Sequence, residues 1–499
     1  MSTPHTIPRT SEEADPRRWL ALAILLLASF MNLVDVTIVN VALPSMQANL
    51  GANSSQIEWV VAAYVLSFAL FLLPFGRLGD IFGRRRMFLA GVTAFTVGSA
   101  LCGLAPSIET LIGARVLQGI AGALMTPQVL SIVQVMFPPK ERGLAFSFFG
   151  LTAGLASVTG PIAGGLLISA DLWDLDWRPI FLVNIPLGIL AVAAAARLVP
   201  KITPHPGLTN DFVGIAIFGL SILAVVFPLV EGRVYGWPLW AFGLIAAGLA
   251  GLVLFYFWEK RRDRAGKTEL LPVTLLDNRN FVIGTLMTLI FFSGVPGLFM
   301  ILAIFLQSGF GLSPLESGLT TIPFPFGVLI VSFLSGRLGS RFLSWRVAIG
   351  SLLLAGGMSY LRWTISQAGD PLNHWDFAPP LFVSGVGLGL AISALFQTIL
   401  TGVPPRDAGS ASGVLQAFQQ VGGALGVALV GEIFFTWLEH AREWGATSQH
   451  SAFVNAATNA AWYEIAAFLV VALMVPLIRR LPQPAAGQVL APPPAAVEA

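Results

Sequence analysis

Long apolar runs, each followed by a short polar segment, repeat along the whole chain. A helix needs about 20 apolar residues to cross a hydrocarbon core of about 30 Å. Each run of that length predicts one membrane-spanning helix, and there are fourteen: 19–41, 57–76, 86–105, 110–135, 143–169, 179–198, 210–230, 237–258, 281–308, 317–336, 346–366, 377–401, 409–437 and 460–479. The first run is too long for a signal peptide and has no cleavage site, so we expect it to be retained as a helix.

Basic residues distinguish the two ends of the predicted helices. With a cytoplasmic N-terminus, all but five of the 28 Lys and Arg residues fall in cytoplasmic loops and tails, as the positive-inside rule requires. The five others are Arg115, Arg178, Arg233, Arg362 and Arg442. We therefore expect both termini in the cytoplasm and a multi-pass protein of a cell membrane, namely a bacterial inner membrane.

Composition supports the same class. The chain has 499 residues, 55% hydrophobic and 11% charged, with a mean hydropathy of +0.78, whereas an ordinary soluble domain is about 25% charged. The lipid bilayer is therefore the expected surrounding. A net charge of +2 excludes a nucleic-acid binder with a strongly basic surface. All five histidines lie outside the apolar runs, which argues against an intramembrane metal site, so we expect no metal.

One sequence segment recurs at an offset of 260 residues. Phe75–Arg86 reads FGRLGDIFGRRR and Ser335–Arg346 reads SGRLGSRFLSWR, with six of twelve positions identical. Both copies follow the second helix of a six-helix set, which is typical of parallel repeats with a binding site between two halves. The predicted organisation is an N-terminal tail (1–18), a six-helix half (19–200), a two-helix insert (201–260), a cytoplasmic loop (261–280), a second half (281–480) and a disordered cytoplasmic tail (481–499).

Short motifs occur in order on the predicted helices: LVDVTIVNVALP (33–44), GRLGDIFGRRR (76–86), RVLQGIAGA (115–123), GLASVTGPIAGG (154–165) and WRPIFLVNIP (177–186). Together they resemble the major facilitator superfamily, in particular its 14-span drug:proton antiporters of the EmrB/QacA type. The resemblance implies an all-α integral membrane protein with the major facilitator fold, two six-helix halves plus two inserted helices. The second half fits less closely, because Ser340 stands where its loop motif would have an Asp.

Two charged residues are predicted to lie inside the membrane. Asp35 lies roughly 25 Å from the cytoplasmic boundary at 1.5 Å per residue, and Arg115 lies at a similar depth. Burial penalises a carboxylate unless it has a partner or can take up a proton. We therefore expect Asp35 to carry the proton and Arg115 to be its partner, although an ion pair that only fixes two helices is the structural alternative. Asn32 and Gln118 lie on the same helix faces as these two residues and are candidate polar residues of the cavity.

Three further groups are candidates for coupling. Glu432 near the outer end of its helix is either an interface residue or a second proton site. The resemblance implies a cytoplasmic gate formed by Gly76, Asp80, Gly83 and Arg84, for which a topology signal alone is the alternative. It also implies an antiporter motif with close, bent helix packing formed by Gly154, Gly160, Pro161, Gly164 and Gly165, for which tight packing without a coupling role is the alternative. Two other acidic residues, Glu58 and Glu464, are expected at the membrane interface.

The predicted function is proton-coupled export of drugs or other amphipathic small molecules by alternating access. The driving force is the proton gradient, so we expect no cofactor and no catalytic residue. Symport of a small metabolite is the alternative within transporters. A polytopic membrane enzyme is less favoured because the membrane holds no catalytic cluster, and a receptor without transport remains possible by sequence. A periplasmic adaptor protein remains open as a partner, and we expect a monomer.

Overall fold

Each predicted apolar run forms one or more helices in the computed structural model, which describes residues 17–201, 211–267, 269–338, 342–369, 371–400, 403, 408–441, 443, 446 and 448–478. Within these residues there is no strand, and thirteen helical segments are long and apolar enough to cross a membrane. The fourteenth predicted run lies in α15 (Leu343–Ser366), a 24-residue helix that Arg346 and Arg362 make more polar. The predicted all-α membrane fold is confirmed.

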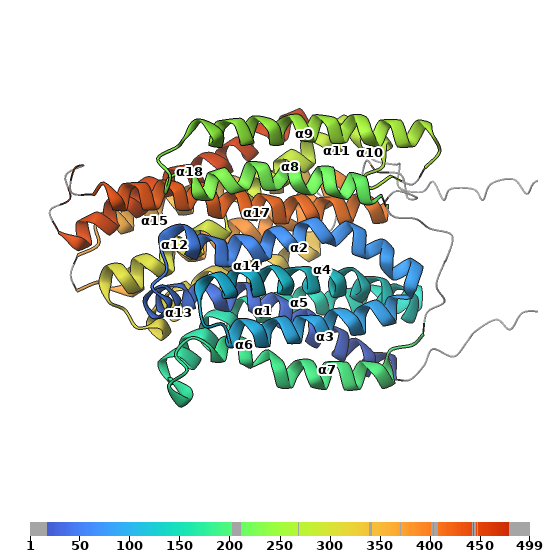
Figure 1. Ribbon diagram of the computed structural model, residues 1–499, viewed down its shortest axis with the longest axis horizontal. Helices are drawn as coiled ribbons and strands as arrows, with labels where there is room; N and C mark the ends of the chain where they lie inside the picture. The colour runs from blue at the N-terminus through green and yellow to red at the C-terminus, as the bar shows by residue number, and fades with distance from the viewer. Residues whose placement is uncertain are drawn as a thin grey trace, which may run out of the picture.

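Along the chain the helices, which Figure 1 labels, fall into two groups of six predicted spans and an additional pair. The first group contains α1 (Arg18–Leu50), α2 (Ser54–Phe82), α3 (Arg84–Gly103), α4 (Ile108–Met136), α5 (Pro139–Ser169), α6 (Pro179–Leu182) and α7 (Asn184–Leu198). The pair is α8 (Phe212–Glu231) and α9 (Leu239–Arg264). After the short α10 (Val273–Leu276), the second group contains α11 (Arg279–Ser293), α12 (Pro296–Ile304), η2 (Phe305–Gly309), α13 (Pro314–Thr321), α14 (Pro323–Leu338), α15, α16 (Ala378–Leu400), α17 (Ala408–Glu439) and α18 (Gln449–Met474). Short 3₁₀ turns lie at η1 (Leu172–Asp174), η3 (His374–Phe377) and η5 (Val475–Leu477).

Three predicted spans are divided where a continuous helix was expected. The span 281–308 is interrupted between α11 and α12, just before Pro296, and the span 317–336 is interrupted just before Pro323. Proline lacks the N–H that would continue the preceding helix, but its fixed φ suits the first turn of the next one. The span 179–198 is likewise divided, between α6 and α7.

Two predicted spans are too short at the same end of the bundle. The first helix runs to Leu50 rather than 41, and α18 begins at Gln449 rather than 460. The additional turns carry polar residues, so the apolar pattern stops before the helix does. This end, which also holds the turn between α8 and α9, is the outer end in the orientation that the sequence predicts, and we use that name for it.

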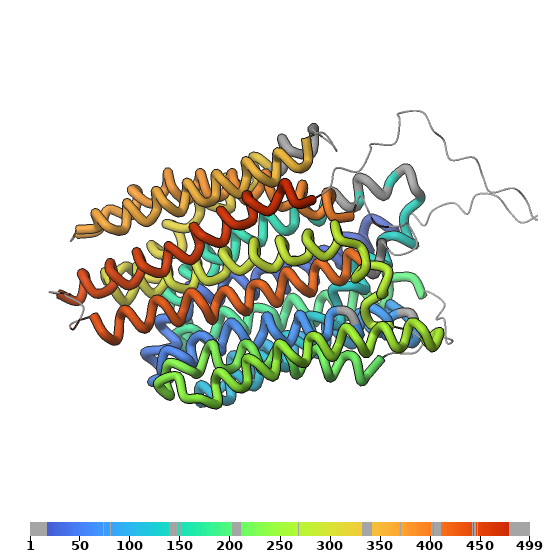
Figure 2. Tube along the Cα trace, turned by 90° about the horizontal axis from the view of Figure 1, so that it is seen from above, coloured from blue at the N-terminus to red at the C-terminus, as the bar shows by residue number. Residues whose placement is uncertain are grey.

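The additional pair lies along one flank of the bundle, whereas α15 and α16 lie along the opposite flank (Figure 2). Helix α8 packs between α2 of the first group and α17 of the second. Gly219 faces Leu70, and the rings of Phe218 and Phe418 are 6.1 Å apart. Helix α9 packs on α8 and is largely exposed. Only 17% of the residues in its most apolar 18-residue stretch are buried. The pair therefore covers the line along which the two halves meet on that flank.

Candidate functional site

An ion pair buried inside the first half joins α1 to α4. The Arg115 Nη1 lies 2.6 Å from the Asp35 Oδ2, and the side chain of Gln118 donates from Nε2 to the Asp35 Oδ1 at 2.7 Å. Asp35 is fully buried and Arg115 is 1% exposed. Both carboxylate oxygens thus accept a hydrogen bond from α4, which satisfies the charge without water.

Helix α2 supplies further partners of the guanidinium. The Arg115 Nε donates to the carbonyl oxygen of Val60 at 3.1 Å, and the guanidinium lies 4.2 Å from the centre of the Tyr64 ring. The Tyr64 hydroxyl accepts a hydrogen bond of 2.6 Å from Asn32. Asn32 therefore reaches the ion pair through Tyr64 rather than through Asp35. Tyr64, a tyrosine inside an apolar run, is the sequence signal that indicates such a partner.

Close approach of the helices explains why the pair is dry. A Cβ on Gly122 of α4 would lie 2.7 Å from the Asn32 Nδ2, and a Cβ on Gly119 would collide with the backbone of Tyr64. The small residues of the RVLQGIAGA segment bring α4 against α1 and α2 at the depth of the ion pair. An unpaired charge at this position has no solvent to stabilise it. The site can therefore hold either the ion pair of Asp35 and Arg115 or a protonated Asp35.

The loop motif between α2 and α3 forms a tight turn. Gly83 has φ of 96°, ends α2 and directly precedes α3, which begins with Arg84. A Cβ on Gly76 would lie 3.7 Å from Pro127 of α4, which is ordinary contact. Asp80 is part of α2, but its side chain lies outside the described part of the structure, as do residues 339–341 of the second copy of the motif.

The glycine motif of α5 packs against helices of both halves. Toward the first half, a Cβ on Gly164 would lie 2.9 Å from Ile38 of α1, and one on Gly160 would collide with Thr37. Pro161, which is expected to bend this helix, lies inside α5.

Toward the second half, the same motif contacts α13 and α14. A Cβ on Gly165 would lie 2.6 Å from the Leu315 Cα, and a Cβ on Gly154 would collide with Leu329. A Cβ on Gly318 of α13 would likewise collide with the Pro161 carbonyl oxygen. The outer ends of the two halves are therefore in direct backbone contact along α5 and α13.

Glu432 lies far along α17 and does not contact the Asp35 pair. Its side chain is 18% exposed and accepts a hydrogen bond of 2.9 Å from the Trp237 Nε1. The Arg233 Nε lies 3.5 Å from its other oxygen. Glu58 of α2 is 3.3 Å from the same Arg233 and is fully buried. Glu58 lies in the first turns of α2, where the α8–α9 turn covers it, and its expected position at the membrane interface stays a prediction.

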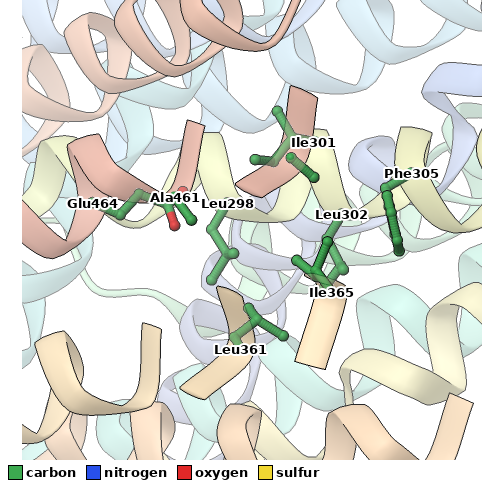
Figure 3. A pocket seen from close by; sticks show the side chains of 9 residues that line it. Leu298, Ile301, Leu302, Phe305, Leu361, Ile365, Ala461 and Glu464 are labelled. Atoms are coloured by element: carbon green, nitrogen blue, oxygen red, sulfur yellow. The ribbon is translucent and has the colours of Figure 1, made fainter. Parts of the chain in front are cut away.

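Glu464 lies deeper in its helix than the expected position at the membrane interface. It lies 16 residues into α18, is fully buried, and neither carboxyl oxygen has a hydrogen-bond partner among the described residues. A small apolar cavity between α12, α15 and α18 adjoins it (Figure 3). Because α18 begins eleven residues before the predicted start, 449 rather than 460, Glu464 is deep in the helix. An ionised carboxylate here would be unpaired in apolar surroundings, so the neutral form is the stable one.

The described residues contain no cluster of His, Cys, Asp or Glu that could hold a metal ion. The described site consists of protonatable side chains and hydrogen-bond donors around one buried ion pair.

Comparison with known proteins identifies the family. A profile of the Major Facilitator Superfamily matches residues 25–214 and 210–427. The chain is 41% identical over 452 residues to a probable actinorhodin transporter of Streptomyces coelicolor, covering 90% of this chain and 77% of the relative. It is 32% identical over 419 residues to the tetracenomycin C resistance and export protein of Streptomyces glaucescens, covering 83% and 76%.

Solved structures with the same arrangement of helices are more distant in sequence. A POT family transporter in complex with 5-aminolevulinic acid has a TM-score of 0.65 at 15% identity, over 95% of this chain and 99% of that one. A bacterial homolog of the human lysosomal transporter Spinster, inward-facing and occupied, has a TM-score of 0.62 at 17% identity, over 93% and 97%. These likenesses concern the fold alone. The chain belongs to the major facilitator superfamily and is a multi-pass secondary transporter, not an enzyme.

Proposed function

We propose that this transporter exports drugs or related amphipathic small molecules in exchange for protons, as a 14-span antiporter of the EmrB/QacA type. The relatives support export, because their names include transport of actinorhodin and resistance to tetracenomycin C and puromycin. The α8–α9 pair between the halves supports the 14-span type. The proposed orientation has both termini in the cytoplasm of a bacterial cell, and the proposed functional unit is a monomer in the lipid bilayer.

The observation that carries the proton coupling is the buried pair of Asp35 and Arg115. Asp35 has one charged and one neutral donor, so the ionised form is stable while α1 and α4 stay together. Movement of Arg115 away from Asp35 would leave a carboxylate without its counter-ion, and uptake of a proton would then neutralise it. Alternation between these two states couples one proton to one change of helix packing. No cofactor is needed, since the proton gradient supplies the free energy.

Transport in proteoliposomes tests this proposal. The purified chain is reconstituted and given actinorhodin, tetracenomycin C or puromycin, and proton release upon substrate addition is recorded together with substrate movement. We expect release with the wild-type chain and none with Asp35→Asn. Glu109→Gln is the matched control, because Glu109 is an exposed carboxylate at the outer end of α4. Substrate movement in the same direction as the proton would favour the symport alternative.

The cytoplasmic gate is a second part of the proposal. Asp80 lies in the last turn of α2, next to the tight turn at Gly83. We expect Asp80→Asn to insert normally and to lose most transport, because the link between the halves is weakened. Wild-type transport by this variant at equal expression would contradict the gate.

A further inference from the structure

The turn between α8 and α9 inserts one arginine between the two halves at the outer end. The Arg233 side chain is 4% exposed. Its Nη2 is 3.3 Å from Glu58 of α2, its Nε is 3.5 Å from Glu432 of α17, and its Nη1 pairs with Glu439, also of α17. One guanidinium therefore contacts a carboxylate of the first half and two carboxylates of the second.

The charges of this cluster do not balance. Glu231, at the end of α8, also faces Glu58, and it accepts hydrogen bonds from Trp59 at 2.8 Å and from Ser55. Among the described residues the cluster thus has four carboxylates, Glu58, Glu231, Glu432 and Glu439, and one cation. Full ionisation would give it a net charge of −3 (+1 minus 4). Glu439 is half-exposed and water can stabilise its charge, but buried excess charge is strongly unfavourable.

Glu58 is the member for which ionisation is least favourable. It is fully buried, and its Oε2 has no hydrogen-bond partner among the described residues. Its carboxyl group lies against the backbone of α17, because a Cβ placed on Gly431 would be 2.6 Å from the Glu58 Cδ. This contact between α2 and α17 is a contact between the two halves, so the carboxyl group stays dry only while the outer end is closed.

We propose that Glu58, together with Arg233 and Glu432, forms a proton-binding site that is loaded from the outer water and controls closure of the outer end. When α2 and α17 separate, water reaches Glu58 and the carboxylate ionises. A proton from the outer solution binds a Glu58 carboxylate oxygen, removes one negative charge and allows the neutral carboxyl group to pack against Gly431. Arg233 then ties the α8–α9 turn to α17 through Glu432 and Glu439, while Glu231 at the end of α8 keeps its hydrogen bonds to Ser55 and Trp59 of α2. The effect on transport rests on the proposed function, whereas proton binding at Glu58 does not.

Infrared difference spectroscopy on the reconstituted full-length chain tests proton binding directly. The carbonyl stretch of a protonated carboxylic acid is recorded as the pH is raised. We expect one component of this band to be present in the wild type and in the control Glu109→Gln, and to be lost in Glu58→Gln. An unchanged band in Glu58→Gln at every pH would overturn the proposal. Glu58→Asp provides a second variant, which should retain a titrating band at a shifted pH.

Thiol labelling tests the link to closure without any substrate. The single Cys102 is replaced by Ser, and Ser55→Cys, next to the cluster, is labelled with a membrane-impermeant reagent. The labelling rate is divided by that of the exposed Asp174→Cys to remove the effect of thiol ionisation. We expect this ratio to fall at acidic pH, and to become low and independent of pH when Glu58→Gln is added. The same pH dependence with and without Glu58→Gln would refute control of closure, whereas failure of proton-coupled export alone would refute the proposed function and leave this site intact.

Discussion

Replacement of Asp35 by Asn tests the buried ion pair most directly. The substitution keeps the size of the side chain and removes its charge, so Arg115, which is 1% exposed, loses its counter-ion. Removing one partner of a buried pair costs about 3–5 kcal/mol, because the other charge remains buried without compensation. The Val60 carbonyl and the Tyr64 ring stay beside Arg115 but are neutral. We expect the free energy of unfolding in detergent to fall by about this amount.

A double-mutant cycle separates the pair from its surroundings. Arg115→Gln alone leaves Asp35 unpaired, whereas the double variant Asp35→Asn with Arg115→Gln is neutral again. The double variant should therefore lose clearly less stability than the sum of the two single losses, with a coupling energy of about 3 kcal/mol. Thermal and denaturant unfolding of the purified chains measure these differences. Additive losses, or wild-type proton-coupled transport by Asp35→Asn, would refute this account and direct attention to other carboxylates.

Three further predictions concern other parts of the molecule. Glu464→Gln should leave the melting temperature almost unchanged, because the wild-type group is already neutral in its apolar cavity, whereas Glu464→Lys should prevent stable folding; a large loss with Gln would contradict this. Gly318→Leu should abolish transport by separating α13 from the Pro161 carbonyl, while Gly113→Leu, a glycine with open space around it, should not; equal export rates would show that the outer contact is dispensable. The hydrogen bond from Arg18 holds the pKa of Glu141 below its usual value, so its stabilising contribution is present at neutral pH and is lost as the pH falls through that lowered pKa. The difference in melting temperature between wild type and Arg18→Gln should therefore shrink below about pH 4, and a difference that grows there would exclude the pair.

The spans and the ion pair were accessible from the sequence for physical reasons. A bilayer requires each crossing helix to be apolar over a fixed length, so the runs are visible without any tertiary information. The similar depth of Asp35 and Arg115 followed from the rise per residue, and the structure places the two side chains in contact. Their role in proton coupling stays a prediction, as do the gate at Asp80 and the role of the α5 glycines.

Contacts between side chains that are far apart in the chain could not be predicted from the sequence. Arg233 is 175 residues from Glu58, and no local pattern indicates that the α8–α9 turn folds over the beginning of α2. The predicted position of Glu464 at the membrane interface is wrong, because α18 begins with polar residues that the apolar pattern does not include. The interruption before Pro296 could have been recognised, since a proline within a helical pattern ends or bends the helix at the preceding residue.

The position of the α8–α9 pair makes the two flanks of the transporter unequal. The halves meet along α2 and α17 on one flank and along α5 with α13 and α14 on the other, and α8 packs against both α2 and α17. A hydrophobic substrate dissolved in the membrane can enter a transporter sideways, between two helices, only where lipid touches that line. We therefore expect any sideways entry in this protein to occur at the contact of α5 with α14, where compounds arriving from the lipid would meet the glycine motif of α5 before the Asp35 pair.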